Sequence, residues 1–177
     1  MEPQELIKQI EVAFDRVKRP NISLRQFRLT DLKGIIGDIT DEEWKQAGKA
    51  RQDSKWRDIP DSEIEECDCV LAHMGAEEYQ YYLPAYMRYS LKHYKLPVWE
   101  SDIIGATVYS VYPSSKDKEL YKYSINQMSL LNSEQENAII HFLEFVAENA
   151  DDVQMSGAKI ALDRYWRKNE YIGTLTV

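Results

Sequence analysis

The sequence contains little glycine, proline or cysteine, and each shortage excludes a class of structure. Seven Gly and six Pro among 177 residues are too few for a turn-rich β-sandwich and favour long helices. The two cysteines, Cys67 and Cys69, lie too close together to staple a fold, which indicates a reducing compartment. No stretch approaches the ~18 apolar residues of a membrane helix, and the start shows no signal-peptide pattern. We therefore expect a cytoplasmic protein that does not enter a membrane.

Sequence motifs of the common enzyme classes are also missing. There is no P-loop, no dinucleotide-binding glycine pattern, no HExxH and no GxSxG. The chain has three histidines, and none of them belongs to a recognisable nucleophile triad. We therefore predict no catalytic residue and no cofactor, which favours a protein that is not an enzyme.

The charge is mainly negative but unevenly distributed. The net charge of −8 repels phosphate groups, which argues against nucleic acid as a partner. Two basic clusters interrupt the acidic chain. They comprise Arg16, Lys18, Arg19, Arg25 and Arg28, and Lys159, Arg164, Arg167 and Lys168. The second cluster lies partly on a predicted helix, where a solvated face explains it without a ligand.

Apolar residues recur at the three- and four-residue spacings of amphipathic helices, as Leu6, Ile10 and Phe14 do. The pattern predicts a mainly all-α fold in which residues 1–177 form a single domain, a bundle of about six or seven helices. The predicted helices cover about residues 3–18, 40–52, 61–74, 76–95 and 100–112, then run from residue 133 onward and over 156–168.

Three segments give no clear helical pattern. Residues 21–39 are predicted to be ordered but irregular, because Gly34 and Gly37 interrupt any long helix. Residues 114–132 are predicted to be a polar loop with a short extended piece, and residues 171–175 an extended strip. Elsewhere, capping-box patterns predict where helices begin. They are Thr40 with Glu43, Ser62 with Glu65, and Ser133 with Glu136.

The most distinctive stretch is the tyrosine-rich segment from residue 79 to 89. On a continuous helix Tyr79, Tyr82 and Tyr86 share one side, whereas Tyr81 points the other way. The favoured interpretation is that the tyrosines are core residues whose hydroxyls reach the surface or a buried partner. The alternative is that some line a recognition groove. Pro84 predicts either a kinked helix or a break.

Cys67, Cys69 and His73 are metal-binding residue types, but their spacing argues against a metal site. Residues two apart on a regular helix point to roughly opposite sides, so the two cysteines cannot chelate one ion. Cys69 and His73 would supply two ligands where a structural zinc site needs four. We therefore predict no metal site.

Six carboxylates and no Lys or Arg lie between Asp58 and Asp68. They lack the spacing and the glycine of a calcium loop. One interpretation is that they favour the positive end of a helix dipole. The other is an acidic face that steers a partner, which makes Asp61 and Glu65 candidate binding residues.

Three segments together suggest a family. They are W-R-D-I-P from Trp56 to Pro60, Y-Y-L-P-A-Y-M from Tyr81 to Met87, and a segment from Leu131 to Leu143. In this order and spacing they resemble a family of small bacterial proteins known only as a domain of unknown function. The resemblance covers about residues 40–168 and leaves out residues 21–39 and the tail. It implies a helical, cytoplasmic bacterial protein and supplies no activity, substrate or catalytic residue.

The leading hypothesis is a non-enzymatic protein-binding module, of adaptor or toxin-immunity type, in a bacterial cytoplasm. Its binding surface is expected to combine the acidic start of the third helix, the W-R-D-I-P turn and exposed tyrosines of the fourth helix. The candidate binding residues are Trp56, Asp58, Asp61, Glu65, Tyr81, Tyr82 and Tyr86.

Two other hypotheses remain open. The first is a small-ligand-binding protein or enzyme with a pocket under the YYLPAYM segment, lined by Tyr82, Tyr86, Asp58 and His73. The second is a self-associating structural protein that uses exposed aromatic surface. The sequence does not decide the oligomeric state.

Overall fold

The computed structural model describes residues 1–34, 37–113 and 117–167. This part of the chain contains nine α-helices and no strand, which confirms the helical class and exceeds the predicted six or seven helices. The helices are α1 Pro3–Ala13, α2 Leu24–Lys33, α3 Asp41–Lys49, α4 Asp61–Glu66, α5 Ala76–Lys92, α6 Ile103–Ser110, α7 Lys118–Gln127, α8 Ser133–Asn149 and α9 Asp152–Ala161. Short 3-10 turns, η1 Trp56–Asp58 and η2 Val70–His73, flank α4, and a π-helical turn, η3 Leu162–Trp166, follows α9.

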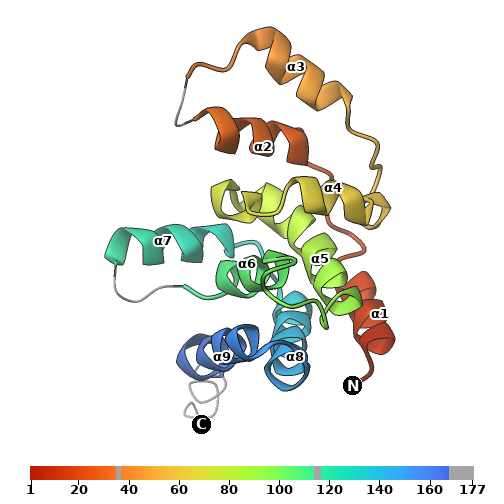
Figure 1. Ribbon diagram of the computed structural model, residues 1–177, viewed down its shortest axis with the longest axis vertical. Coiled ribbons are helices and arrows are strands. Elements are labelled where there is room, and N and C mark those ends of the chain that lie inside the picture. Colours follow the sequence, from red (N-terminus) through yellow and green to blue (C-terminus); the bar gives the residue numbers. More distant parts are fainter. Residues whose placement is uncertain (35–36, 114–116, 168–177) are drawn as a thin grey trace.

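Helix α5 is the centre of the fold (Figure 1). Residues 81–90 are all buried, because α1, α4, α6, α7 and both 3-10 turns pack around this helix. A helix that is covered on every side buries both its apolar and its polar positions. Pro84 lies inside α5, and the helix passes through it as one element from Ala76 to Lys92. Of the two alternatives at Pro84, a kinked helix or a break, the break is therefore absent.

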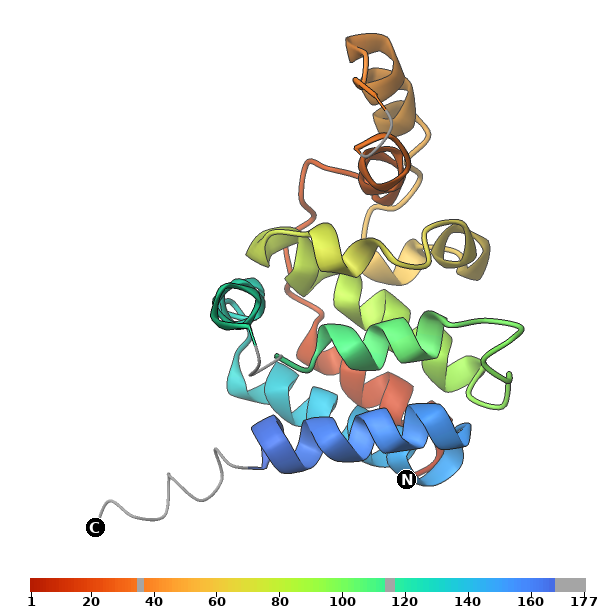
Figure 2. The same ribbon diagram turned by 60° about the vertical axis from the view of Figure 1, so that its left-hand side comes forward.

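A second group of helices closes the core on one side of α5. Helix α8 packs against α1 and α9, and α9 packs against α6 (Figure 2). Gly157 of α9 lies where an added Cβ would be 3.4 Å from Val108 of α6, so the two helices approach closely at that point. None of the helices in the described ranges combines the length and hydropathy needed to cross a bilayer.

Helices α2 and α3 form a hairpin that projects from the opposite end of the molecule (Figures 1 and 2). The prediction of an irregular segment over residues 21–39 is wrong, because α2 occupies ten of these residues. Its start is a capping box that the sequence analysis missed. Ser23 accepts from the Gln26 backbone, and Gln26 Oε1 accepts from the Ser23 backbone at 2.9 Å. Trp44 and Ala47 on the apolar positions of α3 are only half-buried.

Several predicted boundaries differ from the structure for local reasons. The Thr40–Glu43 capping box is confirmed, but the box predicted at Ser62–Glu65 is absent because Pro60 is the N-cap of α4. The box predicted at Ser133–Glu136 forms one residue earlier, at Asn132 with Gln135.

Longer segments differ as well. The polar loop predicted over 114–132 contains α7, which Asp117 caps through the backbone amides of Glu119 and Leu120. The first predicted helix, 3–18, ends at Ala13, and the predicted helix after Pro60 divides into α4 and η2. Residues 171–175 lie outside the described residues.

Candidate functional site

The tyrosines of α5 are internal, and each hydroxyl has a partner. Tyr81, Tyr82 and Tyr86 are at most 1% exposed. The Tyr82 hydroxyl donates to the Ile22 carbonyl at 2.8 Å, and the Tyr86 hydroxyl donates to the Cys67 carbonyl. The prediction that they are exposed to a partner is therefore wrong, whereas the interpretation as core residues with bonded hydroxyls is confirmed. Their side chains hold surrounding segments against α5.

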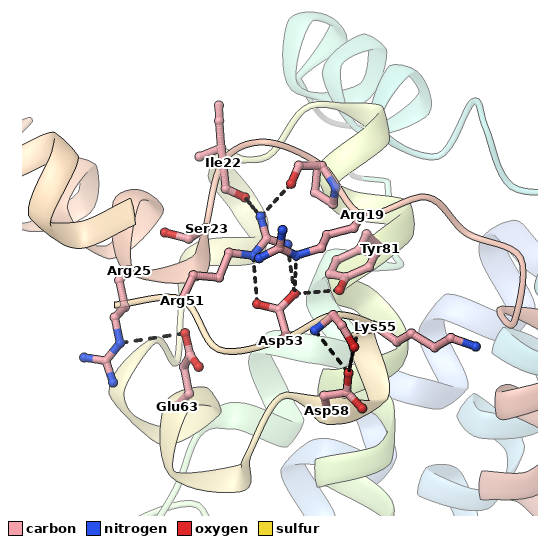
Figure 3. A network of polar contacts seen from close by, with 12 residues as sticks. Arg19, Ile22, Ser23, Arg25, Arg51, Asp53, Lys55, Asp58, Glu63 and Tyr81 are labelled. Carbon is pink, nitrogen blue, oxygen red and sulfur yellow. Dashed lines mark hydrogen bonds and ion pairs between the residues drawn. The ribbon is translucent and has the colours of Figure 1, made fainter. Parts of the chain in front are cut away.

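Four of the surrounding polar groups form a cluster at the base of the α2–α3 hairpin (Figure 3). We call Arg19, Arg51, Asp53 and Tyr81 the clasp. Arg51 donates twice to Asp53, at 2.7 Å to Oδ1 and at 2.9 Å to Oδ2. Tyr81 donates to the same carboxylate at 2.6 Å, and Arg19 Nε lies 3.3 Å from it. Arg51 also donates to the Pro20 carbonyl.

The position of the clasp gives it a mechanical role. Residues 19–23 lead into the hairpin and residues 50–54 lead out, so the clasp ties both legs to each other and to α5. The side chains of Arg51 and Asp53 are 5% and 3% exposed. A bidentate ion pair with further hydrogen bonds is the arrangement that best offsets the desolvation of buried charges. The hairpin is therefore fixed at its base by polar contacts.

The electrostatics of Asp53 reflect this arrangement. Burial alone would raise the pKa of its carboxyl, but the hydrogen bonds from Arg51 and Tyr81 and the charges of Arg51 and Arg19 outweigh burial and leave the pKa below its ordinary value. Nearby Glu63 behaves in the opposite way. Burial raises its pKa, with repulsion from Asp53 and Glu66 added, although Arg25 Nε lies 3.8 Å away.

The lowered pKa of Asp53 predicts a pH dependence of folding. A carboxyl whose pKa is lower in the folded state contributes stability above its unfolded value, 3.8, and loses it as the pH falls through the folded value. We therefore expect Asp53→Asn to be destabilised at neutral pH and to lose less further stability on acidification below pH ~4 than the wild type. Urea midpoints measured across this range check it, with the exposed Asp163→Asn as control. Parallel acid profiles for all three proteins would contradict the prediction.

The residues of the W-R-D-I-P motif are either buried or hydrogen-bonded within the protein. Trp56 is 1% exposed, and its Nε1–H donates to the Phe14 carbonyl at 3.0 Å. Asp58 is exposed, but its carboxylate accepts from the backbone amides of Ser54 and Lys55 at 3.1 and 2.8 Å. The hydrogen bond from the Ser54 hydroxyl lowers the pKa of Asp58 most, and the bonds from the two backbone amides lower it further. The motif thus forms the turn that packs on α5.

Most carboxylates of the acidic run contact cations within the molecule, and the others accept hydrogen bonds. Asp61 lies 3.1 Å from Lys92 Nζ and 3.2 Å from His93 Nε2. Glu65 accepts from the Tyr89 hydroxyl at 3.0 Å. The remaining pairs are Arg25 with Glu63 and Glu66, and Arg28 with Asp68. An acidic face that steers a partner stays a prediction, but most of its carboxylates already have an internal partner.

The residues considered for metal binding do not converge. Burial raises the pKa of Cys67 to about 12, and His73 Nε2 instead contacts Asp31 Oδ1 at 3.0 Å. The described residues contain no group of three or more His, Cys, Asp or Glu placed to hold a metal ion.

A groove lies beside the clasp, away from the YYLPAYM segment. Its volume is about 1240 Å³, above the roughly 300–1,000 Å³ of typical small-molecule pockets. It runs from the segment that leads into the hairpin, along α1, to the starts of α5 and α8. The lining residues are Lys8, Glu11, Val12, Ala13, Asp15, Arg16, Val17, Lys18, Arg19, Pro20, Asn21, Arg57, Glu77, Gln80, Leu130, Asn132, Glu134 and Gln135. A smaller hollow of about 410 Å³ shares Lys8, Val12, Ala13 and Glu134 and continues it along α1 and α8.

Two glutamines fix the walls of the groove relative to each other. Gln80 Nε2 of α5 donates to Gln135 Oε1 at 2.9 Å and to the Leu130 carbonyl at 2.6 Å. Gln135 Nε2 donates in turn to the Ala13 carbonyl at 3.2 Å. Because these bonds join α1, α5 and α8, the groove is preorganised by the fold.

The groove combines exposed apolar residues with unpaired cations. Val12 and Leu130 are 75% and 47% exposed. Arg16 and Lys18 are exposed and form no ion pair within the described ranges. No Ser, Thr, Tyr, Cys or His is among the lining residues described, so no hydroxyl, thiol or imidazole nucleophile faces the groove. Its chemistry is suited to binding.

None of the seven predicted binding residues lines this groove, and Trp56 and the three tyrosines lie beneath the surface. The sequence did contain a signal for the groove, namely the basic cluster at Arg16, Lys18 and Arg19. The apolar part of the groove could not be predicted from the sequence, because an apolar residue such as Val12 is expected in any amphipathic helix.

Comparison with known proteins gives one family. The model of a "Family of unknown function (DUF6714)" matches residues 2–170. The match includes residues 21–39, which the resemblance noted from the sequence left out. No curated protein and no solved structure matches the chain.

Proposed function

The chain belongs to this family of unknown function, and we propose that it is a protein-binding module that seats a segment of another polypeptide in the groove between α1, α5 and α8. The observation that carries the proposal is the groove itself. It is fixed by internal hydrogen bonds, edged by exposed Val12 and Leu130, and lined by no hydroxyl, thiol or imidazole nucleophile among the described residues.

The shape and charge of the molecule support a polypeptide over other partners. A groove lined along α1 and carrying a few apolar anchors suits an extended or helical segment, which places side chains at regular intervals. The net charge of −8 disfavours a nucleic acid. Both cysteines are free thiols, in keeping with a bacterial cytoplasm as the setting, where an adaptor or an immunity-type protein would act by such an interaction.

A charge placed in the groove should abolish partner binding without unfolding the protein. Val12 and Val153 are 75% and 68% exposed, so Val12→Glu and Val153→Glu make the same chemical change at matched exposure on α1 and α9. We expect the wild type and Val153→Glu to retain a common bound protein in quantitative affinity purification and Val12→Glu to lose it. The purified complex would then be reconstituted from its two components to confirm direct contact.

Other outcomes would point elsewhere. Retention of the same proteins by all three variants would exclude the groove as the binding site. Native mass spectrometry of the same samples tests the two other hypotheses. A bound small molecule lost with Val12→Glu would indicate a ligand-binding protein, and a homo-oligomer lost with Val12→Glu would indicate self-association.

A further inference from the structure

We infer that the groove selects an acidic segment, with carboxylates over Arg16 and Lys18 and an apolar side chain on Val12 and Leu130. This inference rests on the proposed function and names the chemistry of the occupant. Two independent features carry it: the local charge at one end of the groove and the exposed apolar surface along its length.

The cations gather where the chain leads from α1 into the hairpin. Arg16, Lys18 and Arg19 are all exposed and lie within four residues of one another. The single carboxylate among them, Asp15, is already engaged by Arg57 and lies 3.9 Å from Lys55 Nζ. This end of the groove is therefore positive in a protein whose net charge is negative, and such a patch attracts carboxylates.

The clasp contributes to this positive end. Arg19 lines the groove while its Nε lies 3.3 Å from Asp53, and Arg51 alone already meets both oxygens of that carboxylate. Because Arg51 already supplies a full positive charge to Asp53, the half-exposed guanidinium of Arg19 can also meet an incoming carboxylate. Its side chain is 43% exposed, compared with 5% for Arg51.

The remainder of the groove has a different character. Its other carboxylates, Glu11, Glu77 and Glu134, lie on the helices and not on the basic segment. Val12 and Leu130 provide apolar surface. A sugar–phosphate backbone has no apolar side chain that could pack against it. The complementary ligand therefore has carboxylates at one end and an apolar anchor beside them, which a polypeptide supplies and a uniform polyanion does not.

Three synthetic peptides of equal length test the inference. They share the same apolar residues and differ at the remaining positions, which are all Asp, all Ser or all Lys. A single-stranded oligothymidylate is the fourth probe. Binding would be followed by amide NMR shifts of residues 8–21 and 130–135. We expect the Asp peptide to bind about tenfold more tightly than the Ser peptide, because each exposed charge contact is worth a few-fold, and to weaken as salt screens it.

Charge-reversal variants give the matched comparison. Arg16→Glu with Lys18→Glu should abolish the preference for the Asp peptide and favour the Lys peptide. Lys159→Glu with Arg164→Glu makes the same change at two exposed residues outside the groove and should leave the preference intact.

The outcomes separate the two proposals. Equal binding of the Ser or Lys peptide, with shifts in the groove, would overturn the inference and leave the proposed function standing. Absence of groove shifts with every peptide would overturn both. Tighter binding of the oligothymidylate than of the Asp peptide would also overturn the inference, because it would show recognition of phosphate.

Discussion

Replacing Asp53 by Ala is expected to lower the free energy of unfolding by about 3–5 kcal/mol, since removing one partner of a buried ion pair leaves the other charge uncompensated. Arg51 would keep its bond to the Pro20 carbonyl but lose both bonds to the carboxylate. Tyr81 would lose the acceptor of its hydroxyl. Urea denaturation followed by circular dichroism measures the loss.

The neighbouring Asp58 provides the control. It is exposed and caps the turn from Ser54, so Asp58→Ala should cost about 1 kcal/mol, as cap removal usually does. The double variant Arg51→Met with Asp53→Leu should be more stable than additivity of the two single variants predicts, because it removes both members of the buried pair and leaves neither charge uncompensated. Strict additivity, or equal losses for Asp53→Ala and Asp58→Ala, would show that the clasp does not hold the fold.

Replacing Asp53 by Ala should destabilise the α2–α3 hairpin before the rest of the fold. The clasp joins both of its legs to α5, and no residue of α3 is buried. Elements with few buried contacts open at lower free energy than the core. We therefore expect amide exchange in α2 and α3 to accelerate more than in α5 when Asp53 is replaced.

The fold class followed from the sequence because periodicity reports directly on which face is buried. The prediction was weakest where polar residues determine the structure. Helix α2 begins at a capping box of Ser23 and Gln26, in which Gln takes the place of the Glu present in the three predicted boxes. Helix α7 has an exposed surface with few buried positions, so its pattern lacked an apolar stripe.

The site was harder to predict than the fold for a related reason. The tyrosine and W-R-D-I-P motifs are conspicuous in the sequence, yet Tyr82, Tyr86 and Trp56 are used to hold distant segments, over separations such as 42 residues between Trp56 and Phe14. Such pairings are tertiary and leave no local pattern. The groove, in contrast, arises from three helix ends whose residues are individually ordinary.

Trp56→Ala is expected to cost about 3–5 kcal/mol, the usual range for removing a buried aromatic side chain and leaving a cavity. Trp56 is 1% exposed and packs beside the guanidinium groups of Arg57 and Arg88, 5.9 and 6.0 Å from its ring. Trp56→Phe keeps most of the ring volume but removes the indole donor from the Phe14 carbonyl, which then keeps only the bond from the Val17 backbone amide at 3.3 Å. Trp99→Ala is the matched control, because Trp99 is 83% exposed and exposed positions usually change stability by less than about 0.5 kcal/mol.

The effect of Trp56 should extend to the groove. Its Nε1–H donates to the carbonyl of Phe14, which lies between the lining residues Ala13 and Asp15. Without this bond, the end of α1 is held less firmly at the wall of the groove. Under conditions where Trp56→Phe remains folded, we therefore expect it to weaken binding of the Asp peptide about three- to tenfold, whereas Trp99→Ala leaves binding unchanged. Unchanged binding by Trp56→Phe would confine Trp56 to stability and leave Arg57 as the residue of the motif that lines the groove.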